Sequence, residues 1–239
     1  MRHRWLRAEW PLSIRAFAVR LKTVPFSATS NQGFVIDRVR DRSIEGRFVE
    51  RTEFTETVVD PFGAETLLPR LQFVQCSFMV YEDFPQLELI DCPRSAHALL
   101  SKLSELTQFS MAVEQVQVDV LSWVRRFRRL AGVRTSIEAI HISRLEVERG
   151  VQAAIVLRGS ADIGEALDKM TRGRSFCLQK VGIKVLEREP VSVVLTSAGV
   201  ATLDASAPQE FAPALREALS SAAKVLRHHN GMSAGTKGP

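Results

Sequence analysis

Between Ile137 and Leu203 the sequence contains several short segments in which polar and apolar residues alternate, interrupted by one helical segment. Ile140 and Ile142 are separated by His141, and this period of two is typical of a half-buried strand. The phase then shifts by one residue, which predicts a β-bulge near Ser143, and a similar shift recurs near Gln179. A chain with this pattern is expected to form a curved sheet.

Short connections separate these strands, at Gly150, at 189–190 and at Gly199. Parallel neighbours would need long crossovers, so the short connections predict antiparallel pairing. We expect 151–157, which is almost wholly apolar, to be a central strand. A helix with an Asp162–Glu165 capping box and a stop at Gly173 should follow it. The predicted fold class is therefore α+β, with curved, mainly antiparallel sheets covered by helices.

The first half of the chain has a similar pattern. Strands are expected at 44–59, 71–81 and 87–90, with a turn at 60–63 (Asp-Pro-Phe-Gly) between the first two. The segment 14–22 alternates in part and is interpreted as an edge strand. Helices are predicted after Asp91 and after Asp119, each beginning at a residue that favours helix starts. A last helix should follow Ser206, with a kink or a later start because of Pro213.

These elements suggest a division of the chain into four parts. Residues 1–33 form a basic N-terminal segment, 34–131 a first α+β half, 132–229 a second α+β half and 230–239 a disordered tail rich in Gly and polar residues. Leu89–Asp91 and Leu203–Asp204 both lead from a strand into a helix. The two halves could therefore be similar sheet-plus-helix units.

Composition narrows the class of protein. No segment approaches the roughly 18 apolar residues that cross a bilayer, so no membrane partner is expected. The basic N-terminus lacks the apolar core of a signal peptide, although an Arg-rich start can also resemble an organelle presequence. Cys76, Cys92 and Cys177 are too few and too widely spaced for a disulfide framework or a zinc site. We expect free or buried thiols and a cytoplasmic location.

Arginine dominates the basic residues. The formal net charge is +5, and 25 of the 32 basic residues are Arg. A guanidinium binds phosphate oxygens with two parallel hydrogen bonds, although a GC-rich genome would also favour Arg over Lys. In the helix predicted after Asp119, Arg125, Arg126 and Arg129 lie opposite the apolar positions. Arg128 and Trp123 lie at the two flanks of the same basic surface.

Patterns for catalysis are weak by comparison. Glu82, Asp83, Glu88 and Asp91 are clustered in sequence, but turns and helix starts explain them and no Lys follows an acid at the spacing of restriction-type nucleases. Cys92 and His97 are too close in sequence for a thiol–imidazole pair. Gly-rich phosphate loops and nucleophile-elbow patterns are absent from the sequence. We therefore expect no catalytic residues, no metal site and no cofactor.

The sequence favours a non-enzymatic nucleic-acid-binding protein that acts as a component of a larger assembly or as a homo-oligomer. Its binding residues are expected to be Arg125, Arg126, Arg128, Arg129, Trp123, Arg2, Arg4 and Arg7. The bound nucleic acid could be DNA or RNA. Two other hypotheses for the arginines stay open: they could pair with acids of the same chain such as Glu50, Glu53 and Glu56, or they could dock on an acidic partner protein. An enzyme ranks third, and a bound divalent metal or a loss of activity on changing Glu88 or Asp91 would favour it.

Overall fold

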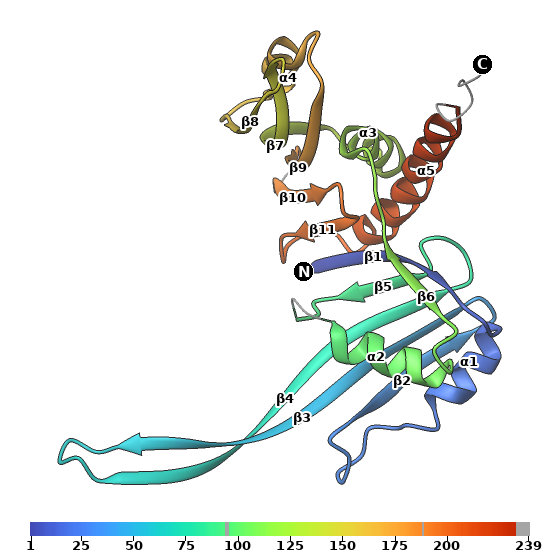
Figure 1. Cartoon of the computed structure of the whole chain (residues 1–239), viewed down its shortest axis with the longest axis vertical. Coiled ribbons are helices and arrows are strands. Elements are labelled where there is room, and N and C mark those ends of the chain that lie inside the picture. Colours follow the sequence, from blue (N-terminus) through green and yellow to red (C-terminus); the bar gives the residue numbers. More distant parts are fainter. Residues whose placement is uncertain (94–95, 188, 233–239) are drawn as a thin grey trace. The chain divides into compact units, whose positions relative to one another are not determined.

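The computed structural model describes residues 1–93, 96–187 and 189–232 (Figure 1), with the side chains of the last helix described up to Ala223. These residues form five helices and eleven strands, so the fold is mixed α+β and mostly sheet. The chain groups into two compact units. Unit 1 comprises Met1–Arg7 and Glu114–Pro239, and unit 2 comprises Ala8–Val113. The division expected near Gly132 falls inside unit 1.

Unit 2 contains a four-stranded antiparallel sheet in the order β2-β3-β4-β5. Its elements are α1 (Ile14–Leu21), β2 (Gln32–Arg40), β3 (Ser43–Val59), β4 (Glu65–Tyr81), β5 (Leu87–Ile90) and α2 (His97–Leu106). The short strand β6 (Ala112–Gln115) begins at the end of this unit, and its last two residues belong to unit 1. The strand order follows the chain order because each connection is short.

Strands β3 and β4 form a long hairpin in which every residue of β3 pairs with one of β4. The predicted turn at 60–63 joins them: the Asp60 carboxylate accepts hydrogen bonds from the backbone N–H groups of Phe62 and Ala64, both at 2.8 Å. All residues from 52 to 73 are exposed. In Figure 1 this outer part extends beyond the other elements of unit 2.

The core of unit 2 lies at the inner end of the hairpin. Phe34, Phe48 and Phe78 are almost fully buried, and the ring of Phe34 contacts the other two at centroid distances of 5.1 and 5.8 Å. Helix α1 buries Phe17 and Leu21. The prediction of an edge strand at 14–22 was wrong. Its apolar residues recur three and four positions apart, and Ser13 caps the first turn by accepting a hydrogen bond from the Ala16 N–H.

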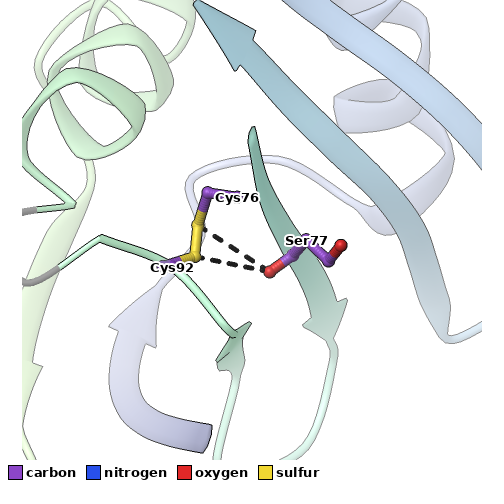
Figure 2. The surroundings of a disulfide bond; sticks show 3 residues. All are labelled: Cys76, Ser77 and Cys92. Carbon is purple, nitrogen blue, oxygen red and sulfur yellow. Dashed lines mark hydrogen bonds between the residues drawn. A yellow bond between two sulfur atoms is a disulfide. The ribbon is translucent and has the colours of Figure 1, made fainter. Parts of the chain in front are cut away.

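A disulfide joins Cys76 of β4 to Cys92, just beyond β5, so the expectation of free thiols was wrong for this pair. The antiparallel register brings the two residues together although they are 16 positions apart in the chain. Figure 2 shows both sulfur atoms near the Ser77 carbonyl oxygen, at 3.8 Å for Cys76 and 3.6 Å for Cys92. Cys177 is a free thiol.

Unit 1 contains a six-stranded antiparallel sheet in the order β1-β11-β10-β9-β7-β8. Its elements are β1 (Arg2–Glu9, of which the first part belongs to this unit), α3 (Val120–Ala131), β7 (Thr135–Glu148), β8 (Val151–Arg158), α4 (Gly164–Thr171), β9 (Phe176–Val185), β10 (Val191–Thr196), β11 (Val200–Leu203) and α5 (Phe211–Met232). The predicted bulges are confirmed, because the β7 register shifts near Ser143 and the β9 register shifts near Gln179.

Two other expectations for unit 1 need correction. Strand β8 was expected to be central, but it lies at the end of the strand order and its residues alternate between exposed and half-buried. Helix α4 begins after Ile163, so Asp162 is not its N-cap as predicted. The Asp162 carboxylate accepts hydrogen bonds from the backbone N–H groups of Gly164 and Ile137. The later start predicted for the last helix is confirmed, because α5 begins at Phe211 and Pro213 lies in its first turn, where a backbone N–H has no partner within the helix. Residues 230–232 belong to α5, and the remainder of the predicted tail lies outside the described residues.

Candidate functional site

Helix α3 carries most of the residues predicted to bind nucleic acid, and its ends follow from the sequence. The Asp119 carboxylate caps the first turn by accepting hydrogen bonds from the Leu121 N–H (3.1 Å) and the Ser122 hydroxyl (2.5 Å). Gly132 ends the helix in the left-handed conformation at φ 67°. Both signals were recognised in the sequence, and both are confirmed.

The apolar side of α3 is anchored in the core of unit 1. Trp123 and Phe127 are fully buried. The Trp123 indole N–H donates to the Leu215 carbonyl of α5 at 2.9 Å, and its ring lies edge-on to Trp5 of β1 at 5.8 Å. Phe127 contacts Phe211 of α5 at 5.4 Å. Because Trp123 has no exposed ring face, it holds the helix in place and offers no surface on which a base could stack.

The opposite side of α3 carries four arginines. Arg125, Arg128 and Arg129 are exposed, and Arg126 is half-buried. The Arg125 guanidinium donates to the Ser122 hydroxyl at 2.8 Å and lies 3.9 Å from the Asp119 carboxylate. Within the described residues, the side chains of the other three make no ion pair or hydrogen bond. We call these four residues the α3 arginine surface.

Two of the acids that could have neutralised this surface have partners of their own in unit 2. Glu53 accepts a hydrogen bond from Arg51, and Glu56 accepts one from Arg70, both within the β3–β4 hairpin. Neutralisation of the α3 arginines by these two acids would require them to leave their present partners. The α3 arginine surface therefore keeps most of its positive charge.

The three N-terminal arginines do not share one face of the sheet. Successive residues of a strand point to opposite faces. Trp5 of β1 contacts Trp123, so the α3 side of the sheet receives Trp5 and, two residues later, Arg7. Arg2 and Arg4 consequently point to the other face. Of the N-terminal arginines predicted to join the α3 surface, only Arg7 lies on the α3 side.

Arg7 and Arg125 line the same cavity, which has a volume of about 870 Å³. Residues 114–121 form one wall and 176–178 of β9 form another. Asp119 and the half-buried Cys177 also line it. Because Arg7 and Arg125 supply two guanidiniums and the segment 114–121 supplies both acids and amides, the cavity is polar but is not uniformly basic.

The acidic residues considered for metal binding have other partners. Arg42 binds Glu82 at 2.7 Å and Asp83 at 2.6 Å, and the Tyr81 hydroxyl donates to the buried Glu88 at 3.2 Å. Within the described residues, no group of three or more His, Cys, Asp or Glu side chains is arranged to hold a metal ion. These acids serve as partners of neighbouring side chains in unit 2.

No known protein family matches this chain. Its sequence is also not significantly similar to that of any curated protein. None of the helices in the described ranges is both long enough and apolar enough to span a membrane. The functional assignment therefore depends on the physical properties of the surfaces.

Sequence reasoning missed a second group of basic residues, on strands of unit 1. Lys180 of β9 and Arg158 of β8 are exposed and lie on the same face of the sheet as Arg2 and Arg4. They are distant in sequence and belong to no motif. Only the register of the strand pairings brings them to one face.

Proposed function

We propose that this protein is a non-enzymatic nucleic-acid-binding component of a larger assembly, and that it contacts phosphates through the α3 arginine surface. The observation that carries the proposal is the contrast between the two sides of α3. Trp123 and Phe127 hold the helix rigidly, while Arg126, Arg128 and Arg129 have no ion pair within the described residues. Guanidiniums fixed in this way form charge-assisted bonds to phosphate oxygens with little loss of backbone freedom.

The charge of unit 1 supports the same proposal. This unit contains 21 Lys and Arg residues against 13 Asp and Glu residues, a formal charge of +8. Positive charge concentrated in one compact unit attracts a polyanion and releases its counterions on binding. No recognition helix is assigned, so the contacts would position the nucleic acid without reading its sequence.

A second candidate function rests on the same exposed arginines. A protein-interaction or scaffold subunit could dock the α3 arginine surface on an acidic partner protein, again with no catalysis and no cofactor. Membership of a complex or a homo-oligomer fits both candidates. The cytoplasmic location, the covering of the sheets by helices and the similarity of two halves remain proposals made from the sequence.

The test is fluorescence anisotropy with labelled single-stranded and duplex DNA and RNA, titrated with salt. We compare the wild type with a variant carrying Arg126→Ala, Arg128→Ala and Arg129→Ala. A matched control replaces three other exposed basic residues of unit 1: Arg149, Lys169 and Arg174. Arg125 is kept because it is bonded to the capping residues of α3.

We expect the α3 variant to lower duplex affinity by about one to two orders of magnitude, while the control changes it much less. The slope of log K against log salt should fall by about 0.9 for each phosphate that the variant no longer neutralises. Equal affinities of the variant and the control would contradict the proposal. If nucleic acid does not bind but an acidic polypeptide does, and the α3 variant fails to bind that polypeptide, the second candidate function is supported.

A further inference from the structure

The strand register of unit 1 places two rows of side chains on one face of its sheet. Residues that pair directly across antiparallel strands lie on the same face. The first row, from β1 to β8, consists of Arg2, Thr202, Val194, Gly182, Ala139 and Arg158. The second row consists of Arg4, Val200, Thr196, Lys180, His141 and Val156. We call these two rows the sheet face.

The sheet face is opposite to the side that carries α3. The row between the two just named contains Ala201, Leu195, Val181 and Ile140, which are at most 1% exposed and form part of the core. Trp5, which contacts Trp123, has the same orientation as this core row. A ligand on the sheet face and a ligand on the α3 arginine surface would therefore lie on different sides of unit 1.

The sheet face is basic and contains no acid. Its charged members are Arg2, Arg4, Lys180 and Arg158, and His141 pairs directly with Lys180. In the adjoining row, Lys184 is already balanced by Glu138, at 3.8 Å. The Nε of Arg4 is buried and has no hydrogen-bond partner. Lys180 and Arg158 are exposed, and within the described residues their side chains make no ion pair.

The first row has small side chains at its middle, on β9 and β7. Gly182 lies beside Ala139, and a Cβ added to Gly182 would come within 3.2 Å of the Ala139 Cβ. Neighbouring strands are about 4.8 Å apart, so the face spans about 24 Å from Arg158 to Arg2. This length suits a segment of about four nucleotides or more.

We propose that the sheet face binds an extended single-stranded nucleic acid across β1–β8, as a second contact surface separate from α3. Arg158 and Lys180 would bind phosphates at one side and Arg4 at the other, while bases lie over Gly182, Ala139 and Thr196. Apart from the His141 imidazole, the two rows carry no aromatic ring, which predicts weak dependence on base identity, because stacking normally supplies part of that preference. This inference rests on the proposed nucleic-acid function and extends it to another face.

The experiment measures binding of labelled oligo-dT, oligo-U and a duplex, each about 20 nucleotides long, to the full chain. The test variant carries Arg158→Ala and Lys180→Ala, and the matched control carries Arg149→Ala and Arg174→Ala. A second test variant, Thr202→Glu, places a carboxylate on the sheet face at an exposed position without removing any side-chain contact made by a basic residue. The α3 variant described above is measured in parallel.

We expect both sheet-face variants to weaken single-strand binding by about tenfold, with duplex binding changed less than twofold. For Arg158→Ala with Lys180→Ala, the single-strand salt slope should fall by about 1.4, since each phosphate contact contributes about 0.7. If the sheet-face variants weaken the binding of oligo-dT and of oligo-U to a similar extent, the sheet face binds both DNA and RNA. Because the two surfaces are on opposite faces, the effects of the α3 and sheet-face variants should add in log K.

Three outcomes would overturn the inference, and they differ in their meaning for the proposed function. If only the α3 variant has a lower affinity, the sheet face is not a contact surface and the proposed function stands. If the sheet-face variants weaken duplex and single strands equally, the single-strand assignment is wrong. If the wild type binds none of the probes, both proposals fail together.

Discussion

Helix α3 and the outer part of the β3–β4 hairpin both have an exposed surface, but the two surfaces differ in polarity. Helix α3 buries its apolar side chains and exposes arginines, three of which have no ion pair within the described residues. The outer hairpin exposes large apolar side chains, including Phe54, Phe62, Leu67 and Leu71. Its one arginine, Arg70, is bound to Glu56. Phosphates are therefore expected to bind the helix and not the hairpin.

The same difference separates the two units. Unit 2 contains 11 Lys and Arg residues against 14 Asp and Glu residues, a formal charge of −3. Several of its arginines are paired: Arg15 binds Asp41 at 2.7 Å, and Arg47 binds Asp37 at 2.8 Å. The hydrogen bond from Arg15 lowers the pKa of the Asp41 carboxyl. The modest net charge of the whole chain thus conceals one strongly basic unit and one mildly acidic unit.

The largest expected effect on stability comes from the buried side of α3. Trp123→Ala should lower the free energy of unfolding of unit 1 by about 3–5 kcal/mol, because it leaves a cavity beside Trp5 and removes the bond to the Leu215 carbonyl. Chemical denaturation followed by circular dichroism measures this change. Trp123→Phe keeps a ring but removes the indole N–H that donates to the Leu215 carbonyl, so it should cost about 1–3 kcal/mol. A decrease below about 0.5 kcal/mol for Trp123→Ala would mean that α3 is not anchored as described.

The α3 helix shows which features could be predicted from the sequence. Its start at Asp119, its end at Gly132 and its two sides all follow from local rules, because a cap, a left-handed glycine and a helical period each involve residues close in sequence. The same holds for the Asp60 turn and for the two bulges. Trp123 was assigned to the surface because its position on the helical wheel is marginal, and its burial depends on α5, which is distant in sequence.

Features that depend on long-range register could not be predicted in this way. Arg158 and Lys180 share a face with Arg4 only because five strand pairings are in the observed register. Cys76 and Cys92 meet because β5 pairs with the inner part of β4. Helix α1 was misread for a different reason. Eight residues are too few to separate a helical period from partial alternation.

An intermediate effect is expected from the disulfide of unit 2. A bond that closes a loop of about 15 residues stabilises a fold by about 3 kcal/mol, so Cys76→Ser with Cys92→Ser should lower the stability of unit 2 by about that amount. Amide hydrogen exchange should show the decrease in β4 and β5, with unit 1 unchanged. Cys177→Ser is the matched control, because its thiol is free.

The redox dependence of this effect tests the predicted location. Structural disulfides are rare in a reducing compartment. Reductant should lower the stability of unit 2 in the wild type by the same amount as the double substitution. It should have no effect on the stability of the variant that lacks Cys76 and Cys92. The Ser77 carbonyl can accept a hydrogen bond from either thiol, so reduction should leave the local strand pairing intact. If protein purified from a reducing cytoplasm has the same stability with and without reductant, the pair is not oxidised there.

The smallest effect is expected at the tip of the hairpin. Phe62 is 94% exposed, so Phe62→Ser should change the free energy of unfolding by less than about 0.5 kcal/mol. Phe48→Ala, in the inner part of the same hairpin, should cost about 3–5 kcal/mol because that ring is buried against Phe34. Thermal unfolding at two protein concentrations measures both. A concentration-dependent decrease above about 1 kcal/mol for Phe62→Ser would show that copies of the chain bury this ring in solution, since mass action makes such stabilisation rise with concentration. The hairpin tip would then be a surface through which copies of the chain associate. The two exposed regions would differ in their ligands, with protein bound at the hairpin tip and phosphates at α3, as proposed above.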